Sequence, residues 1–273
     1  MTDETLDAEV FATLTDKIAR ERGFGAAHYK GTCLRRRIAV RMRARGARDF
    51  AEYIAVLDRD PDEYERLIDA LTINVSKLFR NADTWRAVAR HVMPALWALP
   101  VPTIRTWVAG CAAGEEAYTV AALWHRHAHG AGALDQLARI HVAATDIDRA
   151  CLESAARGTF SATSLEETPG DVRDEFFGRA EPFVASDALK RLVHFERRDV
   201  LQEPPPRGPF HLITCRNVII YFDRTAQDAL IRRFFDALVP GGFLVLGKVE
   251  TLLGASRGLF QVVDQRQRIF RRP

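Results

Sequence analysis

The protein has 273 residues, of which 47% are hydrophobic and 27% are charged. Its 39 lysines and arginines and its 36 aspartates and glutamates give a formal net charge of +3 at pH 7. Collagen-like, low-complexity and disordered proteins are excluded, because the apolar content can support a core and glycine and proline are near average. The length suits one large domain or two modest ones.

We expect a cytoplasmic protein that does not insert into a membrane. The richest apolar stretch, residues 92–101, is short and is interrupted by two prolines. The first ten residues are acidic and polar, unlike the basic and apolar regions of a secretory signal. The four cysteines are too far apart for a zinc ribbon or a redox pair, so we expect four reduced thiols.

Residues 1–80 have the pattern of a small all-α domain made of four short helices. Apolar residues recur at helical spacing through Phe11, Leu14 and Ile18. Asp60, followed by a proline, supplies the cap of a further helix with its own apolar face. That face consists of Tyr64, Leu67, Ile68 and Leu71.

The positive charge is concentrated in one stretch of this domain. Residues 30–48 hold eight basic residues and no acidic one, while the rest of the chain has 31 basic residues against 36 acidic ones. If residues 34–45 are helical, Leu34, Ile38 and Met42 form a stripe that faces the core. The adjacent face is lined by Arg37, Arg41, Arg45 and Arg48. Such a face attracts an acidic partner, although a solvated surface is the commoner role of a run of charges.

Residues 81–103 are predicted to be a linker helix that prolines close. From residue 104 to residue 273, apolar strand-like runs alternate with amphipathic helices. This pattern predicts an α/β domain with a doubly wound, mostly parallel sheet that helices cover on both faces. The helices are expected to begin near Glu115, Arg149 and Thr225. Residues 259–273 are expected to form an antiparallel hairpin at the sheet edge.

A strand, a turn of small residues and a helix are predicted over residues 104–118, IRTWVAGCAAGEEAY. Gly110 and Gly114 let the backbone approach a ligand closely, and the start of the helix favours a polar head group. The spacing is not that of a pyrophosphate-binding loop. Glu115 and Glu116 would repel a diphosphate but suit a cationic or hydroxyl-bearing ligand. A plain strand-to-helix turn is the alternative.

Three further motifs place polar groups at the ends of predicted elements. Asp146 ends the run ARIHVAATDID, where an acid can accept hydrogen bonds from ribose hydroxyls, whereas Asp148 suits the cap of the next helix. The stretch NVSKLFR, residues 74–80, offers amide, hydroxyl and guanidinium donors, or alternatively a helix cap. A third predicted strand is followed by Arg216, Asn217 and Tyr221, at the end where open α/β sheets bind ligands. Structural roles for these residues are the alternative. The turn and Asp146 together favour a nucleoside ligand.

The sequences NVSKLFRN, RTWVAGCAAGEEAYTVA, ATDID and ITCRNVIIYFD, in this order and at these separations, resemble chemotaxis receptor methyltransferases of the CheR type. The resemblance covers nearly the whole chain. It implies a Rossmann-like domain that binds S-adenosylmethionine and transfers a methyl group to glutamates on the cytoplasmic helices of chemoreceptors. The products would be a glutamyl methyl ester and S-adenosylhomocysteine.

The resemblance also implies roles for individual residues. The cofactor contacts would be Asn74, Ser76, Arg80, Glu116, Asp146, Asp199, Val200, Arg216 and Asn217. Arg80 and Tyr221 would lie nearest the transferred methyl group. The receptor would bind on Arg37, Arg41 and Arg45 of the basic helix. This chain departs from the family where Asp199 replaces a usual asparagine and where GKVETL, near Glu250, replaces GHSES.

The same resemblance implies a small inserted β-subdomain within residues 158–198. A receptor tail peptide would dock there, and a response regulator is another partner to consider. We expect a monomer that binds neither nucleic acid nor a metal. His125 and His129 are four residues apart, but no third ligand is near them in the sequence.

Two other functions would use the same features. A nucleic-acid methyltransferase would place the basic stretch on phosphates, but adenine-modifying members usually carry a proline-rich aromatic tetrad where this chain has CRNVIIYF. A catalytically silent adaptor would bind the cofactor without turnover.

For a methyltransferase acting on glutamate we expect catalysis by alignment without a strong base, because the carboxylate, with a reference pKa of about 4.3, is already ionised.

Overall fold

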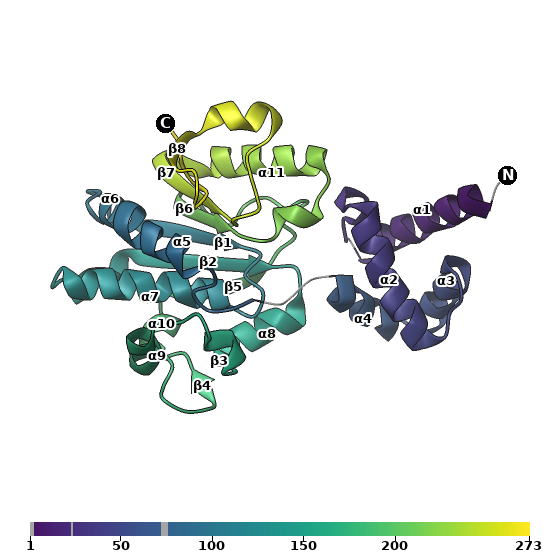
Figure 1. The fold of residues 1–273 in the computed structure, drawn as a ribbon, viewed down its shortest axis with the longest axis horizontal. Coiled ribbons are helices and arrows are strands. Elements are labelled where there is room, and N and C mark those ends of the chain that lie inside the picture. The colour runs from purple at the N-terminus through teal and green to yellow at the C-terminus, as the bar shows by residue number, and fades with distance from the viewer. Residues whose placement is uncertain (1–2, 23, 72–75) are drawn as a thin grey trace. The chain divides into compact units, whose positions relative to one another are not determined.

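The computed structural model describes residues 3–22, 24–71 and 76–273, and the chain divides into two compact units. The first unit is helical and the second contains a central sheet with helices (Figure 1). Their boundaries are Met1–Ile73 with Tyr221–Ala226, and Asn74–Ile220 with Gln227–Pro273. Among the described residues, every helix is too short or too polar to cross a membrane.

The described part of the first unit contains α1 (Asp3–Arg22), η1 (Ala26–His28), α2 (Gly31–Arg45), α3 (Phe50–Arg59) and α4 (Asp62–Leu71). Helix α2 buries Leu34, Ile38 and Met42, which confirms the predicted stripe. It ends at Gly46, where a φ of +70° breaks the helix. Helix α4 also buries the predicted apolar face. Helix α1, with 20 residues, is longer than the short helices predicted.

The segment Tyr221–Ala226 belongs to the first unit through its contacts with the residues after η1. Phe222 forms an antiparallel bridge with Tyr29, and their rings meet edge to face with centroids 5.0 Å apart. The backbone N–H of Lys30 donates to the carbonyl oxygen of Tyr221 at 2.9 Å. Tyr221, predicted as a catalytic residue, therefore belongs to this unit.

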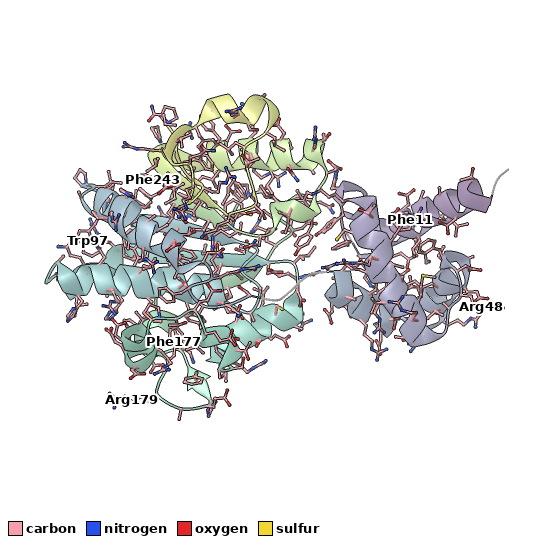
Figure 2. All side chains as sticks on the ribbon, viewed as in Figure 1. Phe11, Arg48, Trp97, Phe177, Arg179 and Phe243 are labelled. Carbon is pink, nitrogen blue, oxygen red and sulfur yellow. The ribbon has the colours of Figure 1, made fainter. Side chains whose placement is uncertain are left out.

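The stretch predicted as a linker forms α5 (Ala82–Ala87), the π-helical η2 (Val88–Val92) and α6 (Met93–Trp97). Trp85 and Met93 are buried in the same core as residues of α7 (Glu115–Gly130). The ring centroid of Trp97 (Figure 2) lies 6.3 Å from that of Trp124 in α7. These helices are therefore part of the core of the second unit.

A seven-stranded sheet with the order β5-β2-β1-β6-β7-β9-β8 forms the centre of the second unit. The strands are β1 (Ile104–Ala109), β2 (Ile140–Asp146), β5 (Val193–Arg197), β6 (Phe210–Cys215), β7 (Leu238–Leu246), β8 (Gln261–Asp264) and β9 (Ile269–Arg271). Neighbours are parallel from β5 to β7, and β9 is antiparallel to β7 and β8. The mostly parallel, doubly wound sheet and the terminal hairpin are confirmed. Because the order reverses at β1, a ligand is expected beyond the ends of β1 and β6.

Helices cover the two faces of this sheet unequally. Helices α7 and α8 (Arg149–Arg157) begin where predicted and cover the face that carries Val108 and Val142. On the other face Trp107 meets Phe234 of α11 (Arg224–Ala237), with ring centroids 5.2 Å apart, and Figure 1 shows α11 along that side. Helix α11 begins one residue before the predicted start.

Helices cover both faces as predicted, but one corner of the sheet has no covering helix. Residues 198–209, which connect β5 to β6, contain no helix. Pro204 begins a run of three prolines there, and proline lacks the N–H that a helix requires and clashes with the preceding turn. His141 and His194, on the same face as Trp107 by strand register, are therefore exposed.

Between α8 and β5 the chain forms a separate two-stranded antiparallel sheet. Its strands and the neighbouring helices are β3 (Thr159–Phe160), η4 (Thr163–Leu165), α9 (Gly170–Phe176), β4 (Phe183–Val184) and α10 (Asp187–Lys190). Phe160, Phe176 and Phe183 are buried in the core that contains α7. The remaining short helices are η3 (Leu134–Arg139), η5 (Ile219–Tyr221) and η6 (Gly254–Leu259).

Candidate functional site

The ends of β1, β2, β5 and β6, with the turns that follow them, form what we term the carboxyl edge of the sheet. After β1, Gly110 and Gly114 have φ angles of +77° and +93°, which residues with side chains disfavour. A Cβ atom at Gly110 would lie 2.4 Å from Cγ2 of Val218, which follows β6. The predicted turn of small residues is confirmed, and Gly110 is required because the segment after β6 packs directly on it.

Asp146 ends β2 beside this turn. Its carboxylate accepts hydrogen bonds from the N–H groups of Ala112 at 2.8 Å and Asp148 at 3.0 Å. Burial raises the pKa of Asp146 above its ordinary value. Asp148 itself caps α8 by accepting from the N–H of Cys151 at 2.9 Å, which confirms the capping interpretation. Since a carboxylate offers about four lone-pair sites, Asp146 retains acceptor capacity for a ligand.

Glu116, in the first turn of α7, is buried and bound to the end of β6. Its Oε1 accepts a hydrogen bond from Oγ1 of Thr214 at 2.6 Å, and its Oε2 faces Nη1 of Arg216 at 3.4 Å. Burial raises the pKa of Glu116, and the positive charge of Arg216 opposes this shift. Both carboxylate oxygens thus have internal partners, so Glu116 fixes Arg216 in place.

Arg216 connects the end of β6 to the segment before α5. Its Nη2 donates to the carbonyl oxygen of Arg80 at 2.8 Å and to Oδ1 of Asn81 at 3.0 Å. The guanidinium carbon lies 4.7 Å from the ring centroid of Trp85, a cation–π arrangement. Together with Glu116, these contacts hold the backbone of Arg80 at the carboxyl edge.

The segment that contains Ser76 and Arg80 is anchored to α7. The N–H of Phe79 donates to Oγ1 of Thr119 at 2.9 Å, in a buried position. Ser76 and Arg80 are half-buried. Asn74, the remaining predicted contact in this motif, lies outside the described residues.

Asn217 is held in a left-handed conformation by Glu250. Its φ is +61°, and its N–H donates to Oε2 of Glu250 at 2.9 Å. The same oxygen accepts from the N–H of Gly247 at 2.6 Å, after β7. A Cβ atom at Gly247 would lie 2.6 Å from Oε2 of Glu250, so only glycine leaves room for the carboxylate. One buried carboxylate oxygen therefore ties the ends of β6 and β7 together.

Asp199 and Val200 form the turn after β5. The carboxylate of Asp199 accepts from the N–H of Leu201 at 2.8 Å and from Nε2 of Gln202 at 3.2 Å. Burial raises the pKa of Asp199. The carbonyl oxygen of Val200 accepts from Nη1 of Arg233 in α11 at 2.6 Å. These bonds fix the turn at the carboxyl edge, beside the β2 end that carries Asp146.

Unusual backbone conformations cluster at this edge. Five non-glycine residues among those described have a positive φ, and four of them lie in the segments just described. The four are Phe79, Asn81, Ala112 and Asn217, and the fifth is Arg268. Such conformations cost about 1–3 kcal/mol each and concentrate at ligand-binding sites. This clustering supports the carboxyl edge as the functional site.

Arg41, predicted to bind the receptor, instead pairs with a buried acid of its own unit. Its Nε and Nη2 donate to the two oxygens of Glu63, at 2.9 and 2.8 Å. The hydroxyl of Tyr53 also donates to Glu63, at 2.8 Å, and the Glu63 side chain has no exposed surface. Burial acts to raise the pKa of Glu63, but the bonds from Arg41 and Tyr53 prevail and hold it below its usual range. The ion pair is part of the core.

The other predicted receptor-binding arginines also have internal contacts. Arg45 donates to Asp60 at 2.8 Å, and Arg37 donates to the carbonyl oxygen of Ala70 at 3.3 Å. By contrast, Arg36 and Arg43 are exposed on α2, and their side chains make no hydrogen bond or ion pair with any described residue. The freely available charge of α2 is therefore on residues that the sequence argument did not select.

His125 and His129 of α7 show no arrangement that suits a metal. The ring of His125 packs against Phe176, with centroids 5.0 Å apart, and burial lowers its pKa. Across the part of the chain that the structure describes, no three or more His, Cys, Asp or Glu residues are grouped to hold a metal ion.

The sequence argument missed Glu250 and Trp85 as parts of the site. Glu250 lies 33 residues from Asn217, so no local spacing links the two. The available signal was Gly247, because a glycine just after a predicted strand can mark a close approach of another group. Trp85 lies in the stretch that was predicted to be a linker, where an aromatic residue followed by Val88 and Val92 indicates a buried helix face.

Comparison with known proteins covers both units. Residues 9–72 match the family model for the CheR methyltransferase all-alpha domain, and residues 74–269 match that for the CheR methyltransferase SAM-binding domain. The chain is 31% identical to a chemotaxis protein methyltransferase of Listeria monocytogenes over 240 residues, which cover 88% of each chain. It is 31% identical to chemotaxis protein methyltransferase 2 of Pseudomonas aeruginosa over 91% of this chain and 88% of that one. A 104.1 kDa protein of Rhodobacter capsulatus is 32% identical over 96% of this chain, which spans only 27% of that relative.

Proposed function

Because the chain belongs to the CheR methyltransferase family, we propose that it transfers the methyl group of S-adenosylmethionine to glutamates on the cytoplasmic helices of chemoreceptors. The products are glutamyl methyl esters, which serve sensory adaptation in chemotaxis, and S-adenosylhomocysteine. One observation supports the proposal: the chain matches both family models, and the motifs that resemble the family meet at the carboxyl edge, where Glu116 bonds to the end of β6 and Arg216 bonds to Arg80.

The carboxyl edge fits S-adenosylmethionine, the cofactor of this family. Asp146, at the end of β2, would accept hydrogen bonds from the ribose hydroxyls. Oε2 of Glu115 and Oδ1 of Asn217 are buried acceptors with no hydrogen-bond partner among the described residues, and buried unsatisfied acceptors call for donors. Burial raises the pKa of Glu115 to about 7. These acceptors suit the hydroxyl and ammonium donors of the cofactor.

When bound, S-adenosylmethionine supplies a methyl group activated by a sulfonium. The substrate glutamate is ionised at neutral pH, so the chain's task is to orient the carboxylate and exclude water. We assign this alignment to Arg80, through a charge-assisted bond, and to Tyr221, through its hydroxyl.

Arg80→Ala should lower kcat far more than cofactor affinity, and Arg80→Lys should restore part of the rate. A variant with a normal single-turnover rate and weak cofactor binding would assign Arg80 to the cofactor instead.

We place the receptor contact on the exposed face of α2. Arg36, Val40 and Arg43 are four and three residues apart and so lie on one side of the helix. Val40 is 50% exposed and offers an apolar contact between the two charges. An acidic, amphipathic receptor helix is complementary to such a surface.

The test is transfer of radiolabelled methyl groups to purified receptor fragments, with base-labile release as the signature of a methyl ester. Arg36→Gln with Arg43→Gln should raise the receptor KM and leave cofactor affinity unchanged. Arg90→Gln with Arg232→Gln, a matched pair of exposed arginines elsewhere, should leave both unchanged. Label transfer to RNA, or cofactor binding without label on any receptor fragment, would refute the proposed function.

A further inference from the structure

The open corner of the sheet holds a cavity of about 530 Å³. Its floor follows from the strand register: Arg105 in β1 lies beside His141 in β2, and Ala143 in β2 lies beside His194 in β5. Paired residues of parallel strands point to the same face, so these four side chains share the floor. Arg191 and Arg207 add to the wall. The volume is typical of a small-molecule site.

The cavity is distinct from the carboxyl edge. Arg105, His141 and His194 lie near the beginnings of their strands, whereas the cofactor residues follow the strand ends. Arg105 is five residues before Gly110, which corresponds to about 16 Å along an extended strand. A ligand in this cavity would therefore leave the cofactor residues free.

The three arginine side chains that line the cavity lack internal partners among the described residues. Arg105, Arg191 and Arg207 make no side-chain hydrogen bond or ion pair with any described residue. The acidic residue that lines the cavity, Glu196, is already paired with Arg198. Three guanidinium groups around one cavity repel each other unless an anion lies between them. By contrast, Arg126, which lines another cavity, is paired with Asp171.

We propose that this cavity binds a small anion that carries two or more phosphate groups. The planar guanidinium group binds phosphate oxygens through two parallel N–H bonds, and all three fixed cations here are arginines, with no lysine. The short side chain of Ala143 leaves space on the floor between the two histidines. Because residues 198–209 contain no helix, this side of the cavity is left uncovered and serves as its entrance.

The experiment is calorimetric titration of the full chain with inorganic tripolyphosphate at low and moderate salt. The triple variant Arg105→Gln, Arg191→Gln and Arg207→Gln should bind about 30-fold more weakly, from about 0.7 kcal/mol for each exposed charge pair. The control triple variant Arg90→Gln, Arg232→Gln and Arg266→Gln removes equal charge from exposed positions outside the cavity. It should bind like the wild type.

Several results would overturn the proposal. These are no binding of tripolyphosphate by the wild type, equal binding by the cavity variant, or equal weakening by the control variant, which would indicate unspecific attraction. Stronger binding of a pentaglutamate peptide than of tripolyphosphate would assign the cavity to an acidic protein segment instead. Thermal unfolding and the affinity for S-adenosylhomocysteine should match the wild type in the cavity variant, which shows that the fold and the carboxyl edge are intact.

Discussion

Replacing Arg41 by glutamine tests whether this arginine of the basic helix α2 stabilises the fold through its ion pair with Glu63. The variant would leave the carboxylate of Glu63, whose side chain is 0% exposed, with the hydroxyl of Tyr53 at 2.8 Å. Two more distant cations would remain, Arg45 at 3.7 Å and Arg66 at 3.9 Å. Removing one partner of a buried ion pair costs about 3–5 kcal/mol. Because the Arg41 side chain is 20% exposed, water can partly replace it, and we expect a cost of about 3 kcal/mol.

The loss should be visible in thermal and denaturant unfolding of the first unit. For a domain of about 60 to 100 residues, 1 kcal/mol shifts Tm by about 4–8 °C, so the shift should exceed about 10 °C. A double-mutant cycle with Glu63→Gln should show a coupling energy of similar size, because the second change removes the uncompensated charge.

The effect of Arg41→Gln should depend on pH in a defined direction. Since the pKa of folded Glu63 lies below its ordinary value of 4.5, the stability it contributes is present above that pH and is lost as the pH falls through the folded pKa. The difference between the wild type and Arg41→Gln should therefore narrow below pH 4.5. A loss under about 1 kcal/mol at pH 7, with no coupling to Glu63, would refute the structural role and return Arg41 to the receptor surface.

Substitutions at two further positions test the carboxyl edge. Gly110→Ala should destabilise the fold by about 1–3 kcal/mol and weaken cofactor binding, because its Cβ would lie 2.4 Å from Val218. Gly46→Ala, at a similar φ with no atom within 4 Å of the added Cβ, should cost only about 1–2 kcal/mol and leave cofactor affinity unchanged. Glu250→Gln keeps an acceptor oxygen and removes the negative charge of a carboxyl group whose pKa is raised by burial. It should raise Tm at neutral pH, and this gain should vanish as the pH falls and the wild-type carboxyl takes up its proton, as melting curves at several pH values would show. Glu250→Ala should instead lower stability by about 1–3 kcal/mol for each N–H left without an acceptor, and weaken S-adenosylhomocysteine binding in a titration.

Local patterns predicted the elements of the carboxyl edge because its residues follow directly after strands. Gly110, Asp146 and Arg216 each lie within one residue of the end of a strand, so the hydrophobic run that predicts the strand also places the residue. The cap formed by Asp148 spans three residues and is equally local. These assignments needed no knowledge of how the strands are ordered.

The roles of the arginines in α2 could not be predicted in the same way. The spacing of Arg37, Arg41 and Arg45 shows that they share a face, but the spacing does not show what lies opposite. Glu63, which pairs with Arg41, is 22 residues away on another helix. A run of charges in the sequence therefore predicted a free basic surface where the fold has a buried ion pair.

The sequence by itself determined the family, the order of helices and strands, and the residues at the strand ends, since backbone periodicity and turn chemistry act over a few neighbours. Only the tertiary structure decided that Glu250 holds Asn217 and that three arginines line an open cavity at the corner of the sheet. These features depend on pairings between residues far apart in the chain and on a connection that prolines keep free of helix. Behind the net charge of +3, basic residues thus have different environments: a buried ion pair, an exposed helix face and a cavity whose arginines are unpaired among the described residues.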